Sequence, residues 1–255
     1  MNALRLALRQ LRYVNKAFWR NPPAAFFTFA FPLMFLVIFT SLLGHGTVQL
    51  GSRSINVSTY YVASMGSFSL ISACFTNLAL SISFQRDTDI LKRLDATPLT
   101  RAAYFTSRVL HALFVSILLV VITAAFGAAF YHASVPSGIT LVRFLTMLLV
   151  GAASFSALGV AATIAVPNAN AGPAVVNAMV LPLLFLSGIF IPLGNNAPTW
   201  IVWVARIFPI RHFALGMQSG FAGTSFQWSD VLVVGLWGLG ALVVAARYFR
   251  FEPRR

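Results

Sequence analysis

The sequence predicts an all-α polytopic membrane protein with six transmembrane helices, and two observations support this fold class. Hydrophobic residues make up 58% of the 255 residues, whereas charged residues make up only 9%. A water-soluble domain carries about 25% charged residues, so this composition indicates lipid as the surrounding solvent. The charges also gather in short segments between long uncharged runs, which is typical of a chain that crosses a bilayer repeatedly.

The first element, residues 1–23, is predicted to form an amphipathic helix on the inner membrane surface. Its basic residues recur every three or four positions and therefore share one helix face. They are Arg5, Arg9, Arg12, Lys16 and Arg20. Apolar side chains such as Leu11 and Val14 occupy the opposite face, as in helices that lie at a membrane interface. Pro22 and Pro23 then break this helix and begin the first span.

Six apolar runs approach or exceed the length of about 20 residues that a membrane helix needs. We expect spans over residues 24–43, 60–84, 109–131, 144–166, 173–191 and 231–246. Pro32 and Pro182 fall inside two of these runs, and membrane helices tolerate proline where neighbours satisfy the freed carbonyls. In the fourth run alanine recurs at every fourth position from Ala153 to Ala165. This spacing favours close helix packing, although an alanine-rich helix without special contacts has the same pattern.

The segment 192–228 is apolar but is interrupted too often to form a span. The interrupting residues are Arg206, Pro209, Arg211 and His212. Trp200 and Trp203 suit the level of the lipid headgroups, where amphipathic rings settle. We expect one or two short re-entrant helices in the outer leaflet before the sixth span. The alternative is a seventh span, which places the basic C-terminal end outside.

The distribution of basic residues sets the orientation of the predicted spans. With the N-terminus in the cytoplasm, 14 of the 18 lysine and arginine residues fall on the inner side and four on the outer side. Inner loops of membrane proteins carry such an excess of positive charge. We therefore expect both termini in the cytoplasm and treat residues 1–255 as a single transmembrane domain. The net charge of +13 follows the same pattern, so we expect no nucleic-acid partner.

Residues 85–105 form the only sizeable cytoplasmic loop between predicted spans. Asp87 and Asp89 favour the N-terminus of a short helix by their interaction with its dipole. Apolar residues at positions 90, 91 and 94 give that helix one apolar edge, and Pro98 stops it. A short amphipathic helix held between two spans is suited to docking in a groove of a soluble partner.

Two motifs resemble the ABC-2 type permeases, the membrane subunits of bacterial ATP-driven exporters. Residues 91–101 read LKRLDATPLTR and are similar to the cytoplasmic loop of that family. The family usually has Gly-Thr where this chain has Asp89 and Ile90, so the start of the helix differs. Residues 186–218 resemble the end of the family's fifth span and the outer re-entrant helices after it. Together with six spans and the amphipathic first helix, the resemblance covers nearly the whole chain.

The resemblance implies that the loop is a coupling helix seated in a cleft of an ATPase subunit. The implied contact residues are Arg86, Asp87, Asp89, Lys92, Arg93, Asp95, Pro98 and Arg101. It also implies that the N-terminal helix touches the ATPase and that the first and fifth spans of two permease copies form the export path. Candidate path residues are Phe35, Phe39, Asn77, Asn177, Met179 and Phe185.

The sequence carries no G-x-x-x-x-G-K-[ST] motif, the phosphate-binding loop of transport ATPases. We therefore expect a transport subunit without its own ATPase site, with no cofactor in this chain and with ATP and Mg²⁺ bound by the partner. We also expect no metal site. Asp87, Asp89 and Asp95 are interleaved with basic residues, and the chain has only five acidic residues in all.

Spans two to five hold almost no ionisable residue away from their ends, which argues against an ion-driven carrier. We expect a bacterial inner-membrane exporter of a hydrophobic or amphiphilic drug, lipid or metabolite, in which antibiotic efflux is one possible role. Expected partners are ABC ATPase subunits, a second or sister permease, and membrane lipid. Export of a polysaccharide or lipid-linked glycan is the first alternative. A membrane-bound enzyme that uses residues 85–101, or a scaffold without transport, is a less favoured alternative.

Overall fold

The computed structural model describes residues 3–43, 46–50, 53–97, 99–193 and 198–249. In this part of the chain the regular structure is helical except for one antiparallel hairpin of β1 (Thr47–Leu50) and β2 (Arg53–Asn56). The helices are α1 (Ala3–Trp19), α2 (Pro22–Leu43), α3 (Val57–Ile71), the π-helical turn η1 (Ser72–Asn77), α4 (Leu78–Asp87), α5 (Ile90–Asp95), α6 (Arg101–Tyr131), α7 (Ile139–Ala162), α8 (Gly172–Leu186), α9 (Thr199–Ile207), α10 (Pro209–Ala222) and α11 (Trp228–Tyr248). The all-α polytopic fold class is thereby confirmed.

Five helices in the described residues are long and apolar enough to cross a membrane. They are α2, the continuous helix of α3, η1 and α4, then α6, α7 and α11. These helices match the predicted first four spans and the sixth span. The predicted fifth span differs, because α8 is helical for only 15 residues. At 1.5 Å per residue α8 is about 22 Å long, so it does not reach across a hydrocarbon core of about 30 Å by itself.

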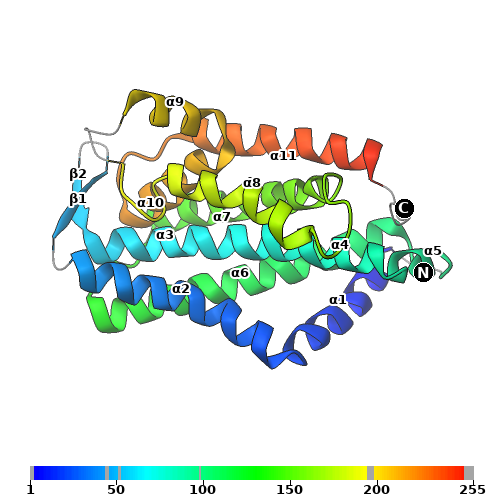
Figure 1. Ribbon diagram of the computed structural model, residues 1–255. Coiled ribbons are helices and arrows are strands. Elements are labelled where there is room, and N and C mark those ends of the chain that lie inside the picture. Colours follow the sequence, from blue (N-terminus) through cyan, green and yellow to red (C-terminus); the bar gives the residue numbers. More distant parts are fainter. Residues whose placement is uncertain (1–2, 44–45, 51–52, 98, 194–197, 250–255) are drawn as a thin grey trace.

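The crossing helices run between two ends of an elongated bundle (Figure 1). One end carries α5, the beginning of α1, the turn from α7 to α8 and the end of α11. The other end carries the hairpin, the connection from α6 to α7, and the short helices α9 and α10. Among the described residues, the loop with α5, the beginning of α1, the turn before α8 and the end of α11, all predicted to be cytoplasmic, thus share the first end. The predicted re-entrant segment, two short helices, lies at the second.

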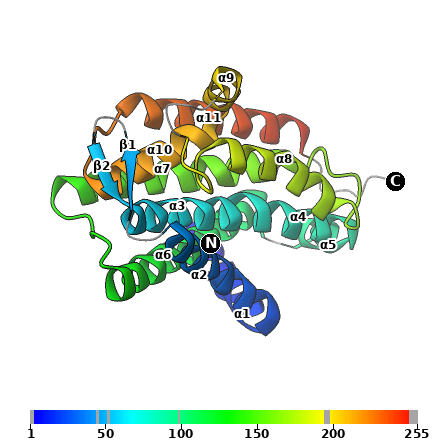
Figure 2. The same ribbon diagram turned by 60° about the vertical axis from the view of Figure 1, so that its left-hand side comes forward.

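The central helix of the bundle is α3, which lies between α6 on one side and α7, α8 and α10 on the other (Figures 1 and 2). Every residue of α3 except Phe68 is buried. Two of its buried hydroxyls are satisfied locally, since Ser67 and Ser69 donate to the carbonyls of Ala63 and Met65 at 2.9 and 2.7 Å. Such bonds let a polar side chain lie inside a helix bundle at little cost.

Glycines, rather than the alanine stripe, provide the closest helix contacts of α7. A Cβ on Gly238 of α11 falls 2.7 Å from the Cα of Ser154, and a Cβ on Gly159 falls 2.9 Å from the Cys74 and Phe75 carbonyl oxygens of η1. Ala153 and Ala165, by contrast, are exposed. The predicted spacing places Ala153, Ala157 and Ala161 on one exposed to half-buried face of α7, whereas Ala165 lies beyond the end of the helix.

Candidate functional site

We call residues 85–105, the predicted coupling loop, the coupling segment. The apolar edge of its helix α5 anchors it to the bundle. α4 ends at Asp87, and Asp89 adopts a left-handed conformation with φ 59° that turns the chain into α5. Leu91 of α5 is fully buried and packs in a cluster with Leu78 and Ile82 of α4 and Tyr104 of α6. The Thr100 hydroxyl accepts a hydrogen bond from the Ala103 amide at 3.2 Å and caps α6. The apolar edge of α5 is therefore packed against the helices on both sides of it in the chain.

Four charged residues of the coupling segment lie on the outer surface of the bundle end. Asp89, Lys92 and Arg93 are exposed, as is Arg101 at the start of α6. The structure thus brings together most of the charged residues predicted for this site. Pro98, a predicted member, lies outside the described residues, and so does the side chain of Asp95.

Two predicted coupling residues bond to the turn between α7 and α8, Arg86 from a buried position and Asp87 from an exposed one. Arg86 is only 3% exposed and donates to the Thr163 carbonyl at 2.9 Å and to the Val166 carbonyl. The Asp87 carboxylate accepts a hydrogen bond from the Ala169 amide at 3.0 Å. These bonds connect residues about 80 positions apart, which no local sequence pattern reveals. They tie the coupling segment to α7 and α8 as well as to α4 and α6.

The four basic residues of α1 lie on its exposed face, as the spacing predicts, and Arg20 just after the helix is exposed too. Ala7 and Val14 on the opposite face are buried, and α1 packs along α6. α1 and α2 meet at an angle and form a V beside the bundle (Figure 1). The basic face of α1 is therefore available at the same end of the molecule as α5.

Three of the six predicted path residues meet around one aromatic ring. Phe35 and Phe39 of α2 and Phe185 of α8 have ring centroids 5.5, 6.2 and 5.0 Å from that of Phe190. The structure separates the others, which do not join this aromatic cluster. Asn77 lines a cavity beside α1, Met179 lines one beside α7 and α10, and Asn177 is half-buried on α8.

The end of α8 is held by side chains from α3, which sequence reasoning did not identify. Gly188 has φ 87°, a left-handed conformation that glycine adopts without strain. The Tyr60 hydroxyl donates to the Gly188 carbonyl, and the Tyr61 hydroxyl donates to the Phe190 carbonyl at 3.1 Å. Carbonyls freed by a broken helix at membrane depth need such donors. The motif at residues 187–190 thus marks a helix end built against α3.

Removing the Tyr60 hydroxyl by Tyr60→Phe is expected to lower the free energy of unfolding by about 1–3 kcal/mol, because a buried carbonyl loses its main donor. Thermal unfolding of the purified protein in detergent measures this loss. Tyr248→Phe is the matched control, since Tyr248 is 62% exposed at the end of α11. Equal midpoints for the two variants contradict the assigned role of Tyr60.

A partly buried polar pair joins the re-entrant segment to the last helix. His212 Nδ1 of α10 lies 2.7 Å from Asp230 Oδ1 of α11, and His212 Nε2 lies 2.9 Å from the Arg206 carbonyl oxygen. Both ring nitrogens therefore face acceptors, which suits the doubly protonated imidazolium. The hydrogen bond with Asp230 raises the pKa of His212 above its usual 6.5, although burial and Arg211 oppose the rise.

This pair predicts that the protein becomes less stable as the pH rises. A group with a raised folded-state pKa contributes its full stabilisation below the unfolded-state pKa and loses it as the pH passes the folded-state value. We expect the unfolding midpoint to fall as the pH rises above 6.5, the usual pKa of histidine. Asp230→Asn is expected to flatten this dependence over the same pH range. An unchanged profile in that variant contradicts the prediction.

The apolar spanning helices and the short helix α5 at the surface together define a class of protein. A bundle of apolar helices long enough to cross a membrane carries, at one end, a short charged helix braced against four of its members. This is the construction of a multi-pass membrane protein with a charged helix on its surface.

Comparison with known families identifies the chain within that class. The family model of the ABC-2 type transporters matches residues 8–222, which is 215 of the 255 residues. The chain belongs to this family and is the membrane permease component of an ABC transporter. Membership implies association with an ABC ATPase. No curated protein matches the chain.

Within the described residues, no group of three or more His, Cys, Asp or Glu side chains is placed to hold a metal ion.

Proposed function

We propose that the chain is the permease subunit of an ABC exporter and that α5 is the helix through which the ATPase drives it. The main support for this proposal is that one side of α5 is buried in the bundle and the other side is exposed. Leu91 is buried among residues of α4 and α6, while Lys92 and Arg93 on the same helix are exposed. A cleft in a soluble subunit can grip the exposed side without disturbing the anchored side.

Under this proposal α5, both chain termini and the turn from α7 to α8 face the cytoplasm of a bacterial cell, at the inner membrane. The excess of basic residues at this end of the bundle supports the orientation. The exposed basic face of α1 offers a second contact for the ATPase or for anionic lipid headgroups. Arg86 and Asp87 act as positioning residues, because their bonds transmit movement to the turn before α8.

We assign the export path to the face formed by α2 and α8. Phe27, Phe31, Phe35 and Phe39 form a ladder along α2 with successive ring centroids 6.1, 6.0 and 5.9 Å apart. Phe27 and Phe31 are exposed, and so is Phe185 on α8. Pairing this face with a second permease, identical or a sister chain, buries the aromatic rings. An aromatic and aliphatic wall suits a hydrophobic or amphiphilic cargo such as a drug, lipid or metabolite.

Export of a lipid-linked glycan is the second candidate, and the position of two tryptophans favours it. Trp200 and Trp203 of α9 are 63% and 68% exposed and lie at the end of the bundle opposite to α5. Aromatic faces at an outer exit are suited to stacking against sugar rings. Replacing both tryptophans by alanine therefore separates the two cargo classes, since only glycan export depends on stacking there.

Transport by inside-out membrane vesicles tests the proposed function. The vesicles hold the permease with its copurified ATPase, and the measured quantity is ATP-dependent accumulation of a fluorescent amphiphile or of a lipid-linked glycan. We expect ATP-dependent accumulation of one of them. A complex that hydrolyses ATP but accumulates neither amphiphile nor glycan contradicts the proposal.

A further inference from the structure

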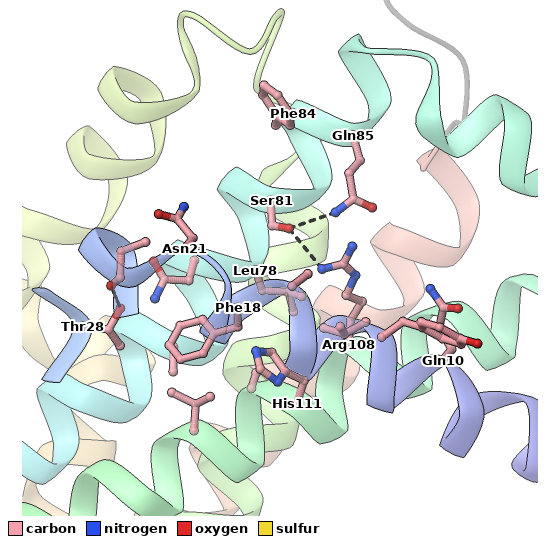
Figure 3. Close-up of a pocket in the computed structure, with 18 residues that line it drawn as sticks. Gln10, Phe18, Asn21, Thr28, Leu78, Ser81, Phe84, Gln85, Arg108 and His111 are labelled. Atoms are coloured by element: carbon pink, nitrogen blue, oxygen red, sulfur yellow. Dashed lines mark hydrogen bonds between the residues drawn. The ribbon is translucent and has the colours of Figure 1, made fainter. Parts of the chain in front are cut away.

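A cavity of about 630 Å³ lies where α1 and α2 meet the helix of η1 and α4 and the first half of α6 (Figure 3). Its volume is within the range of small-molecule and lipid pockets, about 300–1,000 Å³. The phenylalanine ladder of α2 and the exposed residues of α5 do not line this cavity. The cavity is therefore a separate feature of the molecule.

One wall of the cavity carries a positive charge in an ordered polar network. Arg108 donates to the Ser81 hydroxyl at 3.2 Å, Gln85 donates to the same oxygen at 3.0 Å, and the Tyr104 hydroxyl donates to Gln85 at 3.0 Å. Figure 3 shows Arg108 directed toward Ser81, with His111 one turn further along α6. The network fixes the guanidinium at the cavity wall.

Two buried nitrogen atoms of this wall, Arg108 Nε and His111 Nδ1, have no hydrogen-bond partner among the described residues. None of the 18 residues that line the cavity is Asp or Glu. A buried polar group without a partner is unusual, and a cation without a counter-ion is costly at membrane depth. Because no lining residue supplies a counter-ion, we expect an anionic group beside Arg108.

The level of Arg108 along α6 matches the inner headgroup region. α6 has 31 residues and is about 46 Å long, so it exceeds a hydrocarbon core of about 30 Å by about 8 Å at each end. Arg108 lies seven residues after the start of α6 at Arg101, or about 10 Å along it. The guanidinium thus falls near the boundary between headgroups and acyl chains.

The cavity also has an apolar wall, made by residues of α1, α2 and α6, although Gln10, Tyr13 and Thr28 of the first two helices add polar groups to the lining. Ala17, Phe18 and Ala24 line this wall, together with Ala112 and Val115 of α6. An anionic group at Arg108 and an apolar chain against this wall are the two halves of a phospholipid. Basic pockets between membrane helices on the cytoplasmic side bind anionic lipid headgroups in the same manner.

We propose that this cavity binds one anionic phospholipid of the inner leaflet, with its phosphate at Arg108 and an acyl chain beside Phe18 and Ala24. The bound lipid fills the angle between α1 and α2 and holds α1 against α6. The assignment to the inner leaflet rests on the proposed orientation of the permease. Lipid binding itself is measured on purified permease without ATPase, so its failure is distinguishable from failure of the exporter proposal.

Native mass spectrometry of the full chain in detergent tests this site with phosphatidylglycerol and phosphatidylcholine as probes. We expect the wild type to retain phosphatidylglycerol in preference to phosphatidylcholine. Arg108→Gln is expected to lower phosphatidylglycerol affinity by about tenfold or more, since it removes charge-assisted hydrogen bonds. Arg247→Gln is the matched control, because Arg247 is exposed in the last turn of α11, away from the cavity. We expect that variant to bind as the wild type does.

A second variant and a soluble probe sharpen the test. Ala24→Trp starts from an exposed position and fills the cavity, and we expect it to weaken phosphatidylglycerol binding while leaving the unfolding midpoint unchanged. Inorganic phosphate at equal concentration is expected not to displace the lipid. Unchanged binding in Arg108→Gln, an equal loss in Arg247→Gln, or displacement by inorganic phosphate overturns the proposal.

Discussion

The double substitution Lys92→Glu and Arg93→Glu is expected to abolish ATP-driven transport and to weaken binding of the ATPase by about 30-fold or more. Both side chains are exposed on the face of α5 opposite to the buried Leu91. Charges enclosed at a protein interface contribute about 2–5 kcal/mol when one partner is lost, and reversal adds repulsion. Because neither side chain packs in the core, the permease itself is expected to stay folded.

Three measurements on the same preparation check this expectation. They are copurification of the ATPase, ATP-dependent transport in vesicles, and the unfolding midpoint of the permease. Arg247→Glu is the control for added negative charge at the same end of the bundle, and we expect it to behave as the wild type. A double variant that binds the ATPase and transports normally removes α5 from the mechanism.

Gly238→Leu is expected to separate α11 from α7 and to destabilise the permease by about 3 kcal/mol or more. A Cβ at this position falls 2.4 Å from the hydroxyl oxygen of Ser154 and 2.7 Å from its Cα, which is backbone that cannot yield without moving α7. Small residues at such contacts let membrane helices approach closely, and overpacking there forces backbone shifts.

Gly240→Leu supplies a matched comparison on the same helix. A Cβ on Gly240 meets nothing within 4 Å, and the position is exposed. Both substitutions replace glycine by the same helix-forming residue, so intrinsic helix propensity cancels between them. Detergent-solubilised yield and the unfolding midpoint measure the effect. Equal behaviour of the two variants contradicts the close contact between α7 and α11.

The sequence predicts the membrane helices well because length and apolarity are local properties. The same holds for α1, whose basic stripe is exposed as its spacing requires. The fifth span illustrates the limit of this reasoning, since the apolar run continues to Ile191 while the helix stops at Leu186. The helix ends there because Tyr60 and Tyr61 offer hydroxyl donors to the freed carbonyls. Those donors lie almost 130 residues earlier in the chain.

The sequence likewise predicts those features of the candidate site that depend on neighbouring residues, but not those that depend on contacts with distant parts of the chain. The apolar and charged edges of α5 follow from its sequence pattern, and Leu91 is buried where that pattern places it. The inward position of Arg86 depends on carbonyls of Thr163 and Val166 that no pattern in residues 85–105 reveals. His212 and Asp230 are likewise joined by the approach of α10 to α11. Arg108 and His111 are visible in the sequence, because they are two basic residues three positions apart at the start of the third predicted span.

Cysteine cross-linking tests the central claim that the ATPase grips the bundle end that carries α5. Ile90→Cys places a thiol on the exposed surface of α5, and His132→Cys places one at the opposite end of α6, while the native Cys74 is fully buried. In inside-out vesicles with the copurified ATPase, we predict ATP-sensitive cross-links to the ATPase from position 90 and none from position 132. Cross-links from position 132 alone contradict the account.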